Sequence, residues 1–157
     1  MLRYLSITLG VLLCAHAQET PPVKWSIATP PVESAKVRST IKVRVAAEVP
    51  AGWHLYSLKE VEDGPIPTKI TVAEGQPFRQ AGDIEAPGPL IAHDPNFDKD
   101  LEYYEGEVEF VVPVEITMAA APGRQTLTIT ARYQTCNDKL CLPPKTVKLE
   151  LPVTVLP

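Results

Sequence analysis

Two cysteines near the C-terminal end of the chain are the residues best suited to chemistry. Cys136 and Cys141 lie in the run YQTCNDKLCLPPK, between two stretches of alternating apolar residues. Asn137 and Asp138 favour a turn between them, so the chain can reverse there and bring the two Cα atoms within disulfide range. Such a pair forms a disulfide, and attack by a partner thiolate on that disulfide would exchange electrons.

The spacing alone allows two functions for this pair. As a structural staple, a bridge over so short a loop stabilises a fold by roughly 2 kcal/mol, against more than about 4 kcal/mol for a loop of about 100 residues. As a redox site, a local bridge at a turn is easy for a partner thiolate to reach. Lys139 favours an ionised thiol and Asp138 opposes it, so the residues do not decide which cysteine attacks first.

The first residues predict export from the cytoplasm. One cation, Arg3, precedes an apolar run from Tyr4 to Cys14, and Ala15-His16-Ala17 matches the cleavage site of a signal peptide. We therefore expect residues 1–17 to be removed and residues 18–157 to form a single domain in the periplasm.

Processing of the leader also decides the cysteine count. A lipid anchor at Cys14 is disfavoured, because Leu13 is bulky where lipoprotein processing requires a small residue. Once Cys14 is removed with the leader, Cys136 and Cys141 remain as an even pair in an oxidising compartment, which favours a disulfide between them.

Composition argues against several classes of function. The formal net charge is −4, and no basic face for nucleic acid is visible. Neither a Gly-rich phosphate loop nor a G-x-S-x-G motif occurs, so nucleotide binding and serine hydrolysis have no support. His54 and His93 do not form a metal motif with the cysteines, so we expect no metal and no cofactor beyond the cysteine pair.

The elements that position the cysteines are predicted to be strands, because apolar residues recur at period two rather than 3.6. Four segments show this alternation clearly: Ile41 to Ala47, Val108 to Ile116, Leu127 to Tyr133 and Val147 to Val155. One-sided strands of this kind predict two sheets packed face to face. Weaker strand candidates are Val23 to Ala28, Trp53 to Ser57, Lys69 to Ala73, Phe78 to Ala81 and Leu101 to Glu105.

Two stretches are predicted to be long loops, Glu60 to Pro67 and Ala86 to Asp100, and loops of this length are often functional. The second is acidic, with Asp94 and Asp98 among its carboxylates. These carboxylates are either solvated or include one that lies near the cysteines and influences thiol ionisation or proton transfer.

The cysteine run resembles the active-site hairpin of the N-terminal periplasmic domain of the thiol:disulfide interchange protein DsbD. The resemblance rests on Tyr133-Gln134-Thr135-Cys136 and on Cys141 with Pro143-Pro144-Lys145-Thr146 after it. Upstream, Gly52-Trp53-His54-Leu55-Tyr56 is similar to that family's aromatic strand, and His93 to Asp98, followed by Tyr104, corresponds to its cap loop. Val112-Pro113-Val114 matches the strand that follows the cap loop, and the similarity runs from Lys24 to Val155.

This resemblance implies an immunoglobulin-like β-sandwich with the cysteine pair on a hairpin beneath a cap loop. It also implies that Phe97 shields the disulfide, that Cys141 forms the mixed disulfide with a partner, and that Cys136 resolves it. The residues expected around the site are Phe97, Asp98, Trp53, His54, Tyr56, Tyr104 and Tyr133.

The family also implies partners. Electrons would pass from a membrane reductant through Cys136 and Cys141 to oxidised periplasmic proteins, making the chain a component of a protein-disulfide reductase. Because the sequence ends at Pro157, we expect the donor to be a separate membrane electron transporter or thioredoxin-like protein. The alternative is an immunoglobulin-like binding or adaptor domain in which the disulfide is purely structural.

Overall fold

The computed structural model describes residues 23–157, so the predicted signal peptide and Cys14 lie outside the described residues. This part of the chain folds into strands joined by turns and loops, and the all-β prediction is confirmed. No helix within residues 23–157 is long and apolar enough to cross a membrane.

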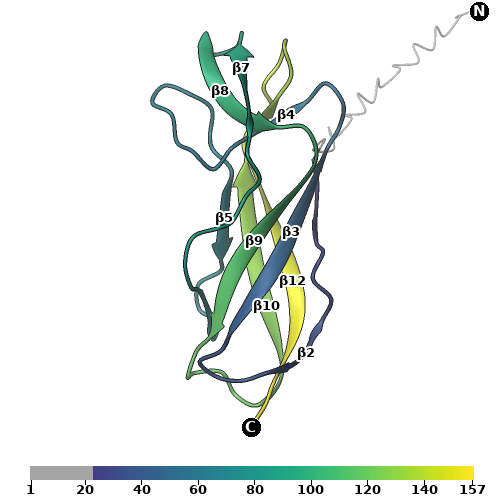
Figure 1. Cartoon of the computed structure of the whole chain (residues 1–157), viewed down its shortest axis with the longest axis vertical. Helices are drawn as coiled ribbons and strands as arrows, with labels where there is room; N and C mark the ends of the chain where they lie inside the picture. Colours follow the sequence, from purple (N-terminus) through teal and green to yellow (C-terminus); the bar gives the residue numbers. More distant parts are fainter. Residues whose placement is uncertain (1–22) are drawn as a thin grey trace, which may run out of the picture.

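Two sheets of four strands form the body of the molecule (Figure 1). The first has the order β1-β3-β9-β6, comprising β1 (Lys24–Ile27), β3 (Thr40–Val49), β9 (Gly106–Ile116) and β6 (Phe78–Gln80). The second has the order β2-β12-β10-β5, comprising β2 (Val32–Ala35), β12 (Lys145–Val155), β10 (Gly123–Tyr133) and β5 (Lys69–Val72). All neighbours are antiparallel except β2 and β12, which run parallel.

The main hydrophobic core lies between these two sheets. Alternate residues of the four long strands point inward, as their period-two pattern predicts, and the opposite residues face outward. Phe110 on β9 is fully buried, with its ring centroid 6.0 Å from that of Trp25 and 5.5 Å from that of Tyr104. The two-sheet sandwich expected from the sequence is therefore present.

A third, smaller sheet lies at one end of the sandwich, and its strands β4, β7 and β8 are at the top of Figure 1. Its order is β11-β4-β8-β7, comprising β11 (Thr135–Cys136), β4 (His54–Tyr56), β8 (Lys99–Tyr104) and β7 (Leu90–Asp94). Because β11 follows β10 after a single residue, the chain passes directly from the main sandwich into the small sheet.

The structure corrects one loop prediction and confirms the other. Residues 60–67 form a loop between β4 and β5, as expected. In contrast, the predicted loop over residues 86–100 contains β7 and the start of β8, joined by a turn at residues 95–98. Four of the five β7 residues are exposed, so β7 has no buried alternating face and is held mainly by its pairing with β8. Strand β2 was also missed, because it is short and mostly exposed.

The depth of the main core gives a prediction for stability. Phe110→Ala should lower the free energy of unfolding by about 3–5 kcal/mol, because it removes a fully buried ring from a packed interior. Ile91→Ala is the control, since Ile91 is 69% exposed and should change stability by less than about 0.5 kcal/mol. Urea unfolding of both variants measures the difference, and equal losses would contradict this account of the core.

Candidate functional site

The site is built around a disulfide between Cys136 and Cys141, whose Cα atoms are 4.0 Å apart. The two residues face each other as an isolated antiparallel bridge. Backbone hydrogen bonds flank them on both sides, from Leu142 N to Thr135 O (3.0 Å) and from Asn137 N to Leu140 O (2.9 Å). Cys136 and Cys141 are therefore a non-hydrogen-bonded cross-strand pair, the type in which Cα atoms approach most closely.

The turn that carries the pair is set by Asn137. Its side-chain Oδ1 accepts hydrogen bonds from the backbone N–H groups of Lys139 and Leu140, at 2.9 and 2.8 Å. An asparagine that bonds its own backbone two or three residues on stabilises a chain reversal. The expected hairpin is present, and its tip at residues 138–140 is exposed.

One strand of the hairpin is anchored and the other is more accessible. Cys136 pairs with His54 on β4, and the Thr135 hydroxyl donates to the His54 carbonyl at 2.8 Å. Cys136 is completely buried, whereas Cys141 is half-buried. A partner approaching from solvent therefore meets Cys141 before Cys136.

A small apolar cluster surrounds the disulfide and is separate from the main core. It consists of Tyr56, Leu101 and Cys136, with Val61, Phe97, Tyr103 and Cys141 packed against them. Phe97 projects from the turn between β7 and β8, and its ring meets the ring of Tyr56 edge-on at a centroid distance of 6.0 Å. The ring of Phe97 thus lies in the same cluster as both cysteines.

Hydrogen bonds of Asn96 stabilise the Phe97 turn and connect it to the cysteine hairpin. Asp94, at the end of β7, accepts bonds from Asn96 N at 2.8 Å and Asn96 Nδ2 at 3.1 Å. The same Nδ2 donates across to the carbonyl oxygen of Asn137 at 2.9 Å. Asp98 closes the turn with a φ of 52°, a left-handed conformation that aspartate tolerates better than most residues.

A buried tyrosine and a buried carboxylate lie beneath this turn. The Tyr56 hydroxyl donates to Asp94 Oδ2 at 2.6 Å, and both residues are at most 3% exposed. Burial, followed by the hydrogen bond to Asp94, raises the pKa of Tyr56 far above its usual value. Burial also raises the pKa of Tyr103, with the nearby carboxylate of Glu105 as the next cause. Both phenols therefore stay neutral at physiological pH.

Six of the seven residues predicted around the site fall into two groups. Phe97 and Tyr56 lie in the disulfide cluster, and the ring of His54 stacks on Tyr103 at a centroid distance of 4.4 Å. Tyr104 and Tyr133 instead point into the main core, and Trp53 packs against that core.

Asp98, the remaining predicted residue, is exposed and lies 3.4 Å from the imidazole of His93. The group closest to the disulfide is therefore smaller than the set expected from the sequence. It comprises the cysteines, Phe97, Tyr56 and the neighbouring His54.

Sequence reasoning missed four contributors to the site, one of which is Val61 in the loop at residues 60–67. Leu101 and Tyr103 lie on the face of β8 toward the disulfide, opposite the face that carries Tyr104, and period two along β8 groups the two on one face without showing which way that face points. Asn96 was not predicted, because its role depends on a contact with Asn137, 41 residues away.

Within residues 23–157, no group of three or more His, Cys, Asp or Glu side chains is placed to hold a metal ion.

The fold and the site together define an immunoglobulin-like β-sandwich that carries a cysteine pair for thiol-disulfide interchange. Residues 28–152 match the family model of the thiol:disulfide interchange protein DsbD, N-terminal. The chain belongs to this family, as the resemblance of the cysteine run indicated. It is accordingly a thiol-disulfide interchange module of the general oxidoreductase type.

Two solved structures have a similar fold. The N-terminal domain of DsbD from Neisseria meningitidis in the reduced form is 17% identical, with a TM-score of 0.54, and the match covers 85% of this chain and 89% of that one. The N-terminal periplasmic domain of ScsB from Proteus mirabilis is also 17% identical, with a TM-score of 0.54, covering 82% of this chain and 44% of that one. No curated protein sequence matches the chain.

The Tyr56 to Asp94 hydrogen bond predicts a pH-dependent stability. At pH 8, Tyr56→Phe should lower the free energy of unfolding by about 1–3 kcal/mol, because a buried carboxylate oxygen loses its donor. Since the pKa of Tyr56 is raised in the folded protein, its contribution is present below pH 10 and falls as pH rises above that value. The difference in the free energy of unfolding between wild type and Tyr56→Phe should therefore become smaller above pH 10.

Urea unfolding at several pH values measures this difference. Tyr103→Phe is the matched control, because the Tyr103 hydroxyl forms no hydrogen bond within residues 23–157, and the variant should have nearly wild-type stability at pH 8. If the difference in the free energy of unfolding between wild type and Tyr56→Phe stays constant between pH 8 and pH 11, Tyr56 does not have the raised pKa in the folded protein.

Proposed function

We propose that the module works as a reductant of oxidised periplasmic proteins, with Cys141 as the attacking thiol and Cys136 as the resolving thiol. The Cys141 thiolate attacks a partner disulfide, forms a mixed disulfide and releases one partner thiolate. Cys136 then attacks the sulfur of Cys141 and releases the second partner thiolate. The partner gains two electrons, and the module is left with the Cys136 to Cys141 disulfide.

The observation that carries this assignment is the difference in burial between the two cysteines. Intermolecular attack requires that a partner sulfur reach the thiol, which favours half-buried Cys141 over fully buried Cys136. Cys136 needs to reach only the sulfur of Cys141, which faces it across the hairpin. The accessible cysteine is thus the one proposed to attack the partner, and the buried cysteine is the one proposed to resolve the mixed disulfide.

Phe97 is proposed to gate access to the pair. Asn96 bonds Asp94 within the Phe97 turn, and its side chain reaches the hairpin through one hydrogen bond, to the Asn137 carbonyl. A partner that displaces this turn would uncover the cysteines without disturbing the main core, which has its own separate cluster of side chains. The gate would limit reaction with thiols that do not engage the turn.

The partners are proposed to be a membrane-embedded or thioredoxin-like thiol protein as donor and oxidised periplasmic proteins as acceptors. Membership of the family supports other thiol-disulfide proteins as the general kind of partner. The ScsB domain is periplasmic by its description, which supports an extracytoplasmic location for this chain. The signal peptide over residues 1–17 stays a prediction.

Single cysteine variants test the assignment directly. Cys141→Ser should abolish exchange with protein disulfides, whereas Cys136→Ser should leave Cys141 bound to its partner as a stable mixed disulfide. Non-reducing electrophoresis after acid quenching measures the trapped species, and loss of the band on adding dithiothreitol is the control. Full activity of both single variants would disprove the exchange mechanism and favour a purely structural bridge.

Removal of the Phe97 ring tests the gate. Half-burial of a phenylalanine contributes about 1 kcal/mol, so Phe97→Ala should raise the rate of disulfide reduction by dithiothreitol about fivefold. Ile91→Ala, on the exposed part of the same β7–β8 hairpin, is the matched control and should react at the wild-type rate. Equal rates for all three proteins would show that Phe97 does not shield the disulfide.

A further inference from the structure

Three cations gather toward the Arg132 end of the outward face of the sheet β2-β12-β10-β5, while Glu150 of β12 lies farther along the same face. On β10, Ala131 is buried, so its neighbours Thr130 and Arg132 point outward. The strand register places Lys69 of β5 directly opposite Arg132, and Lys148 of β12 directly opposite Thr130. All three cations are exposed in a chain whose formal net charge is −4.

The opposed pair of Lys69 and Arg132 lacks a counter-charge. Neither side chain has an ion-pair or hydrogen-bond partner within residues 23–157. Like charges directly opposite each other destabilise a sheet. On the other sheet, in contrast, Arg79 lies opposite Glu115 and forms an ion pair with an N–O distance of 2.7 Å. Repulsion between Lys69 and Arg132 therefore destabilises the folded protein, and a bound anion would offset this repulsion.

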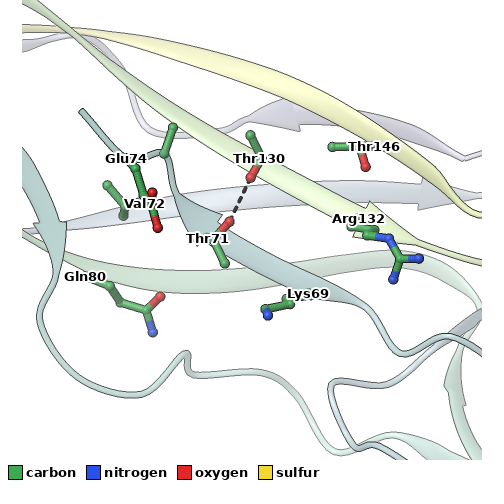
Figure 2. Close-up of a pocket in the computed structure, with 9 residues that line it drawn as sticks. Lys69, Thr71, Val72, Glu74, Gln80, Thr130, Arg132 and Thr146 are labelled. Carbon is green, nitrogen blue, oxygen red and sulfur yellow. Dashed lines mark hydrogen bonds between the residues drawn. The ribbon is translucent and has the colours of Figure 1, made fainter. Parts of the chain in front are cut away.

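A groove of about 620 Å³ lies beside this pair (Figure 2). Its residues are mostly polar: Lys69, Thr71, Val72, Ala73, Glu74, Gln80, Thr130, Arg132 and Thr146. Thr71 and Thr130 are joined by a hydrogen bond of 2.7 Å at its centre, and Arg132 and Glu74 lie toward opposite ends. The Arg132 end thus presents guanidinium, ammonium and hydroxyl donors together.

These donors match a carboxylate-bearing polypeptide better than a lipid surface. Arginine binds carboxylates through two parallel hydrogen bonds, and threonine hydroxyls can donate to the same oxygens. None of the large exposed apolar side chains of the described chain lines the groove, so nothing there would insert into a membrane. The anion is therefore expected to reach the groove on a protein segment.

We propose that this groove binds an acidic segment of the protein with which the cysteine pair exchanges disulfides, and this link to exchange rests on the proposed function. Arg132 lies four residues before Cys136, so their Cα atoms are at most about 14 Å apart. One partner domain can therefore span the distance from Cys141 to the groove. Contact at the groove would orient the partner before the sulfurs meet.

Direct binding is tested with short peptides by NMR titration of the backbone amides of Thr71, Thr130 and Arg132. Hexaglutamate should shift these signals and hexaglutamine should not, and the affinity should fall as salt is raised. Each of Lys69→Gln and Arg132→Gln should weaken hexaglutamate binding about two- to fivefold, the range expected for exposed ion pairs.

Arg44→Gln is the matched control. Arg44 is an exposed, unpaired cation on β3 of the other sheet, so the variant loses the same charge without touching the groove. Binding should be unchanged in this variant. Absence of hexaglutamate binding, or equal weakening in Arg44→Gln and Arg132→Gln, would overturn the proposal.

Exchange kinetics separate this proposal from the function on which it rests. Two peptides, each with one cysteine followed by six glutamates or six glutamines, are allowed to reduce the disulfide. A peptide thiolate joins Cys141 and displaces the Cys136 thiolate, and a second peptide thiol then releases the first as a peptide disulfide. The glutamate peptide should react faster than the glutamine peptide. In the double variant Lys69→Gln/Arg132→Gln, the glutamate peptide should slow to the rate of the glutamine peptide, whose own rate should be unchanged.

Failure of the docking proposal and failure of the exchange function give different results. Equal rates for the two peptides would overturn the docking proposal while leaving thiol exchange intact. If neither peptide reduces the disulfide but hexaglutamate still binds, the proposed exchange function fails, and with it the role of the groove in exchange.

Discussion

The site depends on the path of the chain from Tyr133 to Cys136. Tyr133 is the last residue of β10 and is buried in the main core, and two residues later Thr135 pairs with Leu55 in the small sheet. The eleven-residue ladder between β10 and β12 fixes the position of Tyr133, and therefore fixes where the cysteine hairpin begins. The disulfide is placed by the most extensive pairing in the molecule although it lies outside the main core.

Separation of the two hydrophobic clusters explains how one domain can be both stable and reactive. The large cluster fills the sandwich, while the cluster around the disulfide is small and four of its seven members are only partly buried. Opening of a small, partly exposed cluster costs less free energy than disruption of the core. In the proposed gating, Phe97 and the turn at residues 95–98 would therefore move while Phe110 and its neighbours remain packed.

The sequence was sufficient for the sandwich and for the cysteine hairpin, because both are encoded locally. Alternating residues from Leu127 to Tyr133 and the turn at Asn137 are visible without any tertiary information. The small sheet was harder to predict, since β7 is exposed and is held mainly by pairing with β8. The sides of the small sheet to which Tyr103 and Tyr104 point depend on the register of β4 with β8. No local sequence pattern supplies that register.

In the proposed function, the bridge between Cys136 and Cys141 cycles between oxidised and reduced states. Equilibration of the protein with glutathione buffers, followed by thiol alkylation to count reduced cysteines, gives the reduction potential of this bridge. We predict a reduction potential well above about −300 mV, within reach of thiol-disulfide partners. A reduction potential below about −300 mV would instead identify a purely structural disulfide and rule out exchange at this pair.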